Sequence, residues 1–125
     1  MIHSFDGQVA VVTGAAQGNG KAIATALAQA GAAVACCDMQ ADAMAHDLAP
    51  FGIRVNAIAP GVIETPMTQA TRADPDAIGR FMAHTPMRRV GLPEELAGPV
   101  LFLASPAASY VTGAMLPVDG GYLSA

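Results

Sequence analysis

The amino-acid sequence predicts an α/β domain with a mostly parallel sheet of four strands. Short apolar runs that suit buried strands alternate with segments of helical spacing, in the order βαβαβααβ. The chain has 125 residues, of which 53% are hydrophobic and 13% are charged, a composition that suits one domain with a sizeable core. We therefore expect residues 1–125 to form a single domain with helices flanking the sheet.

The first third of the chain predicts a βαβ module. Residues 8–13 form an uncharged, valine-rich run that is typical of a buried strand. Residues 14–20 are rich in glycine and predict a turn, and a helix is expected to follow over about 19–30. A second apolar run, 33–37, predicts a parallel strand that ends at Asp38. The connection between the two strands should be right-handed.

The remainder predicts two more strands and three helices. A short helix is expected over 41–49, a third strand over 53–58 and a last strand over 113–118. Asp74 should cap a helix that opens with proline, and Pro93 should open another that continues to about Ala104.

Composition excludes several classes of partner. A formal charge of −4, a pI near 5.0 and scattered arginines argue against nucleic acid and anionic membranes. Residues 96–118 are uncharged but contain three prolines, so a helix, a turn and a strand explain them better than a membrane span. The N-terminus lacks signal-peptide features, and the adjacent Cys36 and Cys37 are poorly placed to pair with each other. We expect a cytoplasmic protein, and no cluster has the spacing of a metal site.

The most informative segment is the turn at residues 13–20, which reads TGAAQGNG. Glycines there permit a sharp strand-to-helix turn and a close backbone approach to a pyrophosphate, which the N-terminus of the next helix attracts. A P-loop does not fit, because alanine stands where its glycine and its serine or threonine are needed. The alternative is a tight turn that uses glycine for geometry alone. The candidate dinucleotide-binding residues here are Gly14, Gln17, Gly18, Asn19 and Gly20.

Asp38 indicates which dinucleotide would bind. It ends the second expected strand, where a carboxylate can accept hydrogen bonds from an adenosine ribose and repel a 2′-phosphate. Neither Gln17 nor Met39 adds a positive charge beside the expected phosphate position. This favours NAD over NADP, whereas the alternative is a solvated aspartate at a strand end.

At this point the sequence resembles the short-chain dehydrogenases/reductases. Their T-G-x-x-x-G-x-G turn and acidic residue match Thr13–Gly20 and Asp38, and their sixth strand with its Pro-Gly turn matches 52–61. Segments 89–95 and 110–121 are similar to the family's C-terminal helix and last strand. The resemblance implies a Rossmann-like, doubly wound fold and hydride transfer between a nicotinamide and a carbonyl or alcohol carbon.

The resemblance also implies residues on the nicotinamide side of the cofactor. These are Pro60, Gly61, Ile63 and Thr65, which lie in and after the Pro-Gly turn. The C-terminal segment from Ser105 to Tyr122 is most similar to members that act on polyols and sugar alcohols.

The family's third to fifth strands, its catalytic serine and its Y-x-x-x-K motif have no counterpart here. Lys21 is the single lysine, and glutamine stands at position 17 where the motif would need tyrosine. We therefore expect no catalytic residue in this chain. Tyr110, Tyr122 and Glu64 are poor substitutes, because the tyrosines match structural positions and Glu64 fits an exposed loop acid.

The resemblance divides the chain into a dinucleotide-binding part at 1–40 and a C-terminal part at 48–125, joined near 41–47. The expected strand order is 2-1-3-4, with the third strand placed beside the first. If the short connector cannot reach, the first strand exposes an edge, and dimerisation or aggregation should follow. A homodimer through the last helix and strand is the expected oligomer.

Three functions remain open from the sequence. The first is an internally deleted NAD-binding domain that lacks catalysis. The second is an NAD-dependent oxidoreductase of alcohols, polyols or ketones, if the chain is longer or another base substitutes. The third is a non-enzymatic deletion product or an oligomer partner of a full-length relative.

Overall fold

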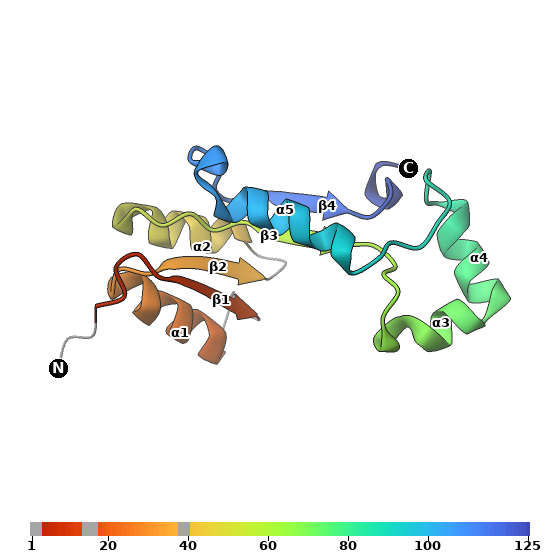
Figure 1. The fold of residues 1–125 in the computed structure, drawn as a ribbon, viewed down its shortest axis with the longest axis horizontal. Helices are drawn as coiled ribbons and strands as arrows, with labels where there is room; N and C mark the ends of the chain where they lie inside the picture. Colours follow the sequence, from red (N-terminus) through yellow and green to blue (C-terminus); the bar gives the residue numbers. More distant parts are fainter. Residues whose placement is uncertain (1–3, 14–17, 38–40) are drawn as a thin grey trace. The chain divides into compact units, whose positions relative to one another are not determined.

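A computed structural model describes residues 4–13, 18–37 and 41–125 of the chain (Figure 1). The strands and helices of this part are β1 (Val9–Thr13), α1 (Gly18–Gln29), β2 (Ala33–Cys37), α2 (Ala41–Leu48), β3 (Ala57–Pro60), α3 (Gln69–Ala73), α4 (Pro75–Ala83), α5 (Glu94–Ala104) and β4 (Met115–Val118). This alternation of strands and helices confirms the α/β class. No helix among these residues is long and apolar enough to cross a membrane.

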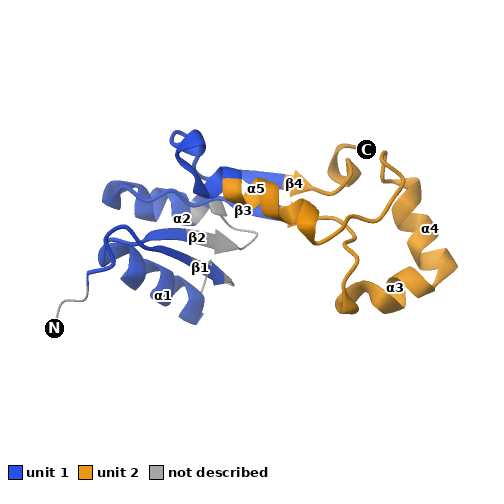
Figure 2. Cartoon of the chain, viewed as in Figure 1, with its two compact units in different colours: residues 1–58, 102–116 blue, residues 59–101, 117–125 orange. Residues whose placement is uncertain are grey.

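The chain divides into two compact units, coloured separately in Figure 2. Unit 1 contains residues 1–58 and 102–116, and unit 2 contains residues 59–101 and 117–125. Whether the whole chain is one domain stays a prediction.

Unit 1 contains the expected βαβ module. Strands β1 and β2 pair in parallel, with Val9 opposite Ala33 and Thr13 opposite Cys37. Helix α1 contributes Ala24 and Ala28 to a core in which Leu48 of α2 is also buried. Alanines on α1 let the helix lie close to its neighbours, so the module closes around small side chains. Among the residues whose burial is described, this core consists of Ala24, Ala28, Ala32, Val34, Met44, Ala45, Leu48, Ile53, Val55 and Ala57.

The expected single sheet of order 2-1-3-4 is wrong for the part of the chain that the structure describes. The strands form two two-stranded sheets, β1–β2 and β3–β4. The short connector explains the difference. After α2 the chain reverses at Gly52, whose φ is +72°, and the Ile53 amide donates to the Leu48 carbonyl. Ile53 and Val55 are thereby buried in the core beside α2 instead of extending a ladder along β1.

The third strand begins later than its apolar pattern predicts. The backbone amide of Val55 donates to the Thr112 hydroxyl, and the Asn56 side chain donates to the Val111 carbonyl and accepts from the Ala114 amide. Side chains therefore take the place of a backbone ladder here. Regular pairing with the last strand starts at Ala57, whose amide donates to the Ala114 carbonyl.

Unit 2 contains α3 and α4, the first turns of α5, and the loops that join them to β3 and β4. The Asp74 carboxylate accepts from the amides of Asp76 and Ala77, which confirms the expected cap of α4. Ile63 and Thr85 are the residues buried in this unit. Contacts between loops therefore contribute much of the stability of unit 2, whereas a hydrophobic core stabilises unit 1.

Candidate functional site

The predicted dinucleotide site in unit 1 centres on the first turn of α1. The helix begins at Gly18, whose φ of +55° lies in the left-handed region that favours glycine. Gly18 and Asn19 are exposed, Gly20 is half-buried, and no acidic residue occupies the first turn. The first N–H groups of a helix have no partner within the helix, so these groups and the positive end of the helix dipole suit an anion.

Four of the proposed cofactor residues, Gly14, Gln17, Asp38 and Met39, lie outside the described residues. The strand register nevertheless bears on them. Because Thr13 pairs with Cys37, the chain leaves β1 and β2 at adjacent points on the same edge of the sheet. In parallel α/β sheets, this carboxyl edge is where ligands bind.

The Pro-Gly turn lies at the end of β3 in unit 2. Pro60 is the last residue of that strand, and the Gly61 amide donates to the Val118 carbonyl over 3.1 Å. A Cβ on Gly61 would lie 2.8 Å from the Asp119 Cα, which is backbone that cannot move aside cheaply. Glycine at this position therefore permits the close approach of two backbones.

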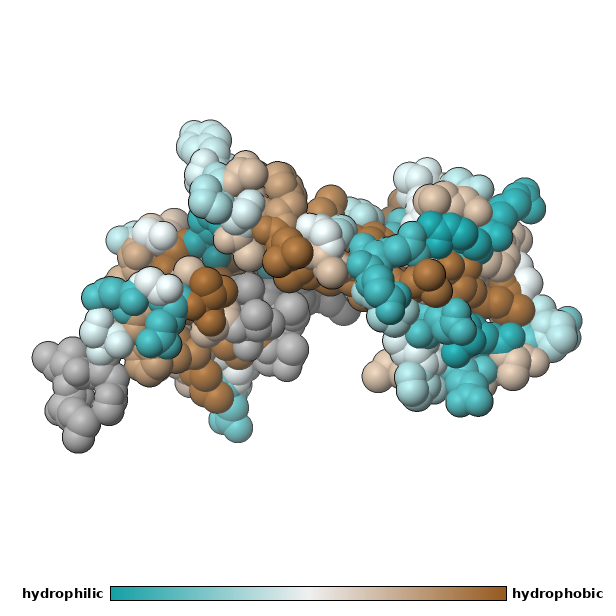
Figure 3. Space-filling model, in the orientation of Figure 1, coloured by the Kyte–Doolittle hydropathy of each residue, from teal (hydrophilic) through white to brown (hydrophobic). Residues whose placement is uncertain are grey.

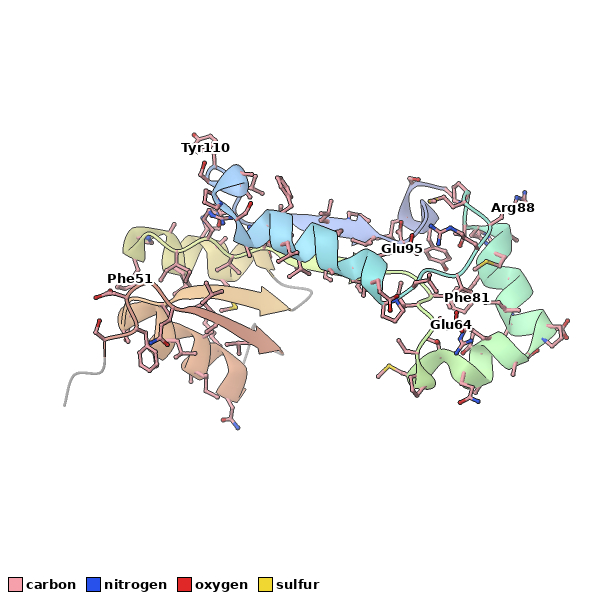
Figure 4. The ribbon with its side chains drawn as sticks, in the orientation of Figure 1. Phe51, Glu64, Phe81, Arg88, Glu95 and Tyr110 are labelled. Carbon is pink, nitrogen blue, oxygen red and sulfur yellow. The ribbon has the colours of Figure 1, made fainter. Side chains whose placement is uncertain are left out.

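The next residues of the turn are fixed to a second loop. Ile63 is buried and pairs in parallel with Gly91, whose amide donates to the Val62 carbonyl and whose carbonyl accepts from the Glu64 amide, both over 2.9 Å. The Glu64 carboxylate is exposed and lies 3.6 Å from the Arg72 guanidinium. Figure 4 shows Glu64 on the segment that leads into α3. Glu64 is therefore an exposed loop acid with an arginine beside it.

Arg72 also fixes the backbone at Thr65. Its guanidinium donates to the Thr65 carbonyl and to the Thr68 hydroxyl, each over 3.2 Å. The Thr68 hydroxyl in turn accepts from the Thr65 amide. The half-buried Thr65 is therefore held by main-chain contacts, and it forms a capping box with Thr68 at the start of the short helical turn Pro66–Thr68.

A cavity of about 580 Å³ adjoins this turn within unit 2. Its walls include Gly61 and Ile63 from the turn, Met82 and Met87, and Leu123. The lining is mainly apolar with a few polar groups, as in many small-molecule sites. Pro60 and Thr65 are not part of the lining, so the structure brings only two of the four nicotinamide-side residues to this cavity.

The cavity wall also contains an ion pair that the sequence reasoning missed. Arg89 donates to both carboxylate oxygens of Glu95, over 2.8 and 2.6 Å. The Leu92 amide donates to the same carboxylate over 2.8 Å. These hydrogen bonds from Arg89 and Leu92 lower the pKa of Glu95 from its ordinary 4.5 to about 2. An acid in the first turn of a helix, six residues after an arginine, was the available signal.

The two tyrosines have different surroundings. Tyr110 is fully exposed and projects away from the ribbon in Figure 4. The Tyr122 ring lies at a tilt against the rings of Phe81 and His84, with centroids 5.9 and 6.4 Å away. Among the described residues, no group of three or more histidine, cysteine, aspartate or glutamate side chains could hold a metal ion.

Comparison with known proteins identifies the family. A family model described as "Enoyl-(Acyl carrier protein) reductase" matches residues 41–123, and one described as "short chain dehydrogenase" matches residues 8–45. The chain belongs to the short-chain dehydrogenase/reductase family. Together the two matches cover both the glycine-rich turn and the Pro-Gly turn.

Curated relatives match only part of their own length. The FixR protein of Bradyrhizobium diazoefficiens is 58% identical over 78 residues, which cover 62% of this chain and 26% of that protein. A galactitol 2-dehydrogenase (L-tagatose-forming) of Cereibacter sphaeroides is 55% identical over 80 residues, covering 64% and 32%. This chain therefore spans about a third or less of the length of these two relatives.

Solved structures support the Rossmann-type fold of this family. A 4-hydroxyisoleucine dehydrogenase mutant complexed with NADH and succinate has a TM-score of 0.71 at 20% identity, covering 84% of this chain and 53% of that one. An Agrobacterium tumefaciens protein assigned as a 2-deoxy-D-gluconate 3-dehydrogenase, with bound NADP, has a TM-score of 0.69 at 24% identity and covers 98% of both chains. At these identities the likeness concerns the fold alone.

Proposed function

We propose that this chain binds a nicotinamide dinucleotide through its βαβ module and does not catalyse hydride transfer on its own. The observation that carries the proposal is the start of α1, where a glycine with positive φ opens a helix whose first turn has no acid. That arrangement fits a pyrophosphate. The NADH- and NADP-bound structures with this fold give it further support.

NAD is the preferred cofactor in this proposal. Asp38 follows β2 directly, and β2 ends opposite the last residue of β1. A carboxylate there would accept hydrogen bonds from the adenosine ribose and would repel the additional phosphate of NADP. Gly14, Gln17 and Met39 would complete the dinucleotide side of the site.

The nicotinamide side would be supplied by Pro60, Gly61, Ile63 and Thr65. A bound nicotinamide dinucleotide supplies a hydride donor or acceptor, and the chain must then supply a proton at the substrate oxygen. The family's Y-x-x-x-K motif does this elsewhere, whereas the single lysine here, Lys21, pairs with Asp47 over 3.0 Å. Binding without turnover is the consequence.

The matches to the two family models overlap at residues 41–45, which supports a junction between two family segments near 41–47.

A fluorescence titration with NADH tests the proposal. The wild-type chain should bind NADH saturably, and the Asp38→Ala variant should bind at least about tenfold more weakly, since a hydrogen bond to a charged group contributes about 1.5–3 kcal/mol. NADPH should bind more weakly than NADH to the wild type, and the difference should narrow in the variant.

Asp76→Ala is the matched control, because it removes the same charge from an exposed position in α4. Its NADH affinity should equal that of the wild type. Absence of saturable binding at millimolar NADH, in protein that is folded by circular dichroism, would contradict the proposal.

The proposed homodimer uses α5 and β4. Helix α5 is rich in apolar residues, yet none of them is buried, and Leu101 is 69% exposed. Phe102 of α5 and Met115 of β4 are exposed as well. Figure 3 shows hydrophobic surface over α5. A second copy that covered this face would remove that surface from water.

The galactitol relatives favour a second candidate for a protein that contains this chain and the missing catalytic residues. Such a protein would be an NAD-dependent oxidoreductase of polyols or sugar alcohols. The intact mass of the natural product distinguishes the candidates, because a mass well above 12.6 kDa would favour the enzyme. The third candidate, a non-enzymatic partner of a full-length relative, predicts co-purification with a larger dehydrogenase. A cytoplasmic location is part of the proposal.

A further inference from the structure

One edge of β1 has no strand beside it in the part of the chain that the structure describes. The β1–β2 sheet has only these two strands, and Val9, the first residue of β1, is 64% exposed. An edge strand presents a row of backbone N–H and C=O groups that can pair with a further strand. The edge is a candidate interaction surface that goes beyond cofactor binding.

The register identifies which backbone groups face outward. The Ala33 amide donates to the Gln8 carbonyl over 2.8 Å, and Val9 is opposite Ala33. In a parallel ladder, alternate residues of a strand direct both of their backbone groups to the same neighbour. The even-numbered residues of this stretch therefore face β2. The N–H and C=O groups of Val9, Val11 and Thr13 face the open edge.

The sequence of this edge lacks two features that keep edges unpaired. No charged residue and no proline occurs between Gly7 and Gly20, whereas natural edge strands use both to prevent pairing. Two copies of the segment can therefore lie side by side without like charges meeting. The strand is also odd in length, and Val11 is its central residue.

We propose that β1 pairs with β1 of a second copy of this chain in an antiparallel ladder centred on Val11. A twofold axis at Val11 places it opposite its own copy and places Val9 opposite Thr13 of the partner. Because these are the outward-facing residues, each pair exchanges two backbone hydrogen bonds. The result is a continuous four-stranded sheet of order 2-1-1-2 across two molecules.

Residue-resolved amide hydrogen exchange tests this pairing. The experiment uses the Leu101→Glu variant, so that association through α5 does not contribute. For exchange through the free monomer, a hundredfold increase in protein concentration should slow exchange at Val9, Val11 and Thr13 by about tenfold, following mass action. Exchange at Ala10 and Val12 should not change in this way, because these amides are bonded to β2 at every concentration.

A pair of substitutions at Val9 provides the second readout. Val9→Pro removes an outward-facing N–H at the first position of a strand, where proline is tolerated, and leaves the bonds to β2 intact. Val9→Ala shortens the same side chain and keeps the N–H. In sedimentation velocity, the alanine variant should dimerise like the Leu101→Glu parent, whereas the proline variant should be monomeric.

Three results would overturn the proposal. One is rapid exchange at the odd-numbered amides at every concentration while Ala10 and Val12 stay protected. Another is protection of the odd-numbered amides in a monomer, which would mean that the chain covers its own edge. The third is dimerisation of a folded Val9→Pro variant. If that variant does not fold, the exchange pattern of the parent still decides the question.

Discussion

In unit 1 the buried residues form one apolar core between α1, α2 and β2, whereas unit 2 buries only Ile63 and Thr85 among its described residues. The loops of unit 2 are instead held by polar groups. Arg72 binds the Thr65 backbone, Arg89 binds Glu95, and the Asp119 carboxylate accepts from the Gly121 and Leu123 amides.

The two units should therefore lose stability through different kinds of substitution. Removing buried volume should weaken unit 1, because close-packed interiors leave gaps that relax only partly. Unit 2 should respond to altered backbone contacts and to the charge of the groups that hold its loops.

The largest effect should come from Leu48→Ala. Leu48 is 2% exposed and packs in the core of unit 1, so its truncation should lower the free energy of unfolding by about 2–5 kcal/mol. Urea denaturation followed by circular dichroism measures the change. Leu101→Ala, at an exposed position, is the control and should change stability much less. Equal losses in both variants would remove the contrast between core and surface.

A smaller loss should follow Gly61→Ala in unit 2. The added Cβ would lie 2.8 Å from the Asp119 Cα, and the resulting shift should cost about 1–3 kcal/mol. Gly79→Ala is the matched control, because a Cβ there meets nothing within 4 Å and the residue lies inside α4. That variant should gain about 0.5–1 kcal/mol. Denaturation curves that rank the two variants the other way would show that the close approach at Gly61 is not what requires glycine.

The smallest effect concerns the pH dependence of the loop that Glu95 holds. Because folding lowers the pKa of Glu95 from 4.5 to about 2, its contribution to stability is present above pH 4.5 and is lost as the pH falls toward 2. A carboxyl-carbon NMR titration should give a midpoint near 2 for the wild type. In Arg89→Met the midpoint should move toward 4.5. An unchanged midpoint in that variant would show that Arg89 is not the main cause.

The sequence was most informative where pattern and local chemistry agree. The valine run, the glycine-rich turn and the second apolar run predict β1, α1 and β2 to within one or two residues. Asp74 followed by proline likewise predicts the start of α4. Each of these elements depends on residues close together in the chain, so a local pattern is sufficient to find it.

The errors arise where distant residues decide the structure. The alternating stretch at 53–56 resembles a strand, but side-chain hydrogen bonds replace its ladder. The Val55 amide donates to the Thr112 hydroxyl, and the Asn56 side chain donates to the Val111 carbonyl. The prediction of a single four-stranded sheet was wrong because the chain reverses after α2 at Gly52. That reversal depends on the packing of α2, which a local sequence pattern does not reveal. The bidentate pair of Arg89 with Glu95 was missed for another reason. Its residues are only six apart, but the irregular loop between them has no periodic pattern that would predict the contact.

The most direct test of dinucleotide binding at the start of α1 is an NMR titration of ¹⁵N-labelled protein with NADH. Saturable shifts at the amides of Gly18, Asn19 and Gly20, weakened by Asp38→Ala and unaffected by Asp76→Ala, are the expected result. They would place the dinucleotide at the start of α1. A spectrum of folded protein in which these amide signals do not shift at millimolar NADH would contradict dinucleotide binding. The chain would then share the ancestry of its family but not its cofactor binding.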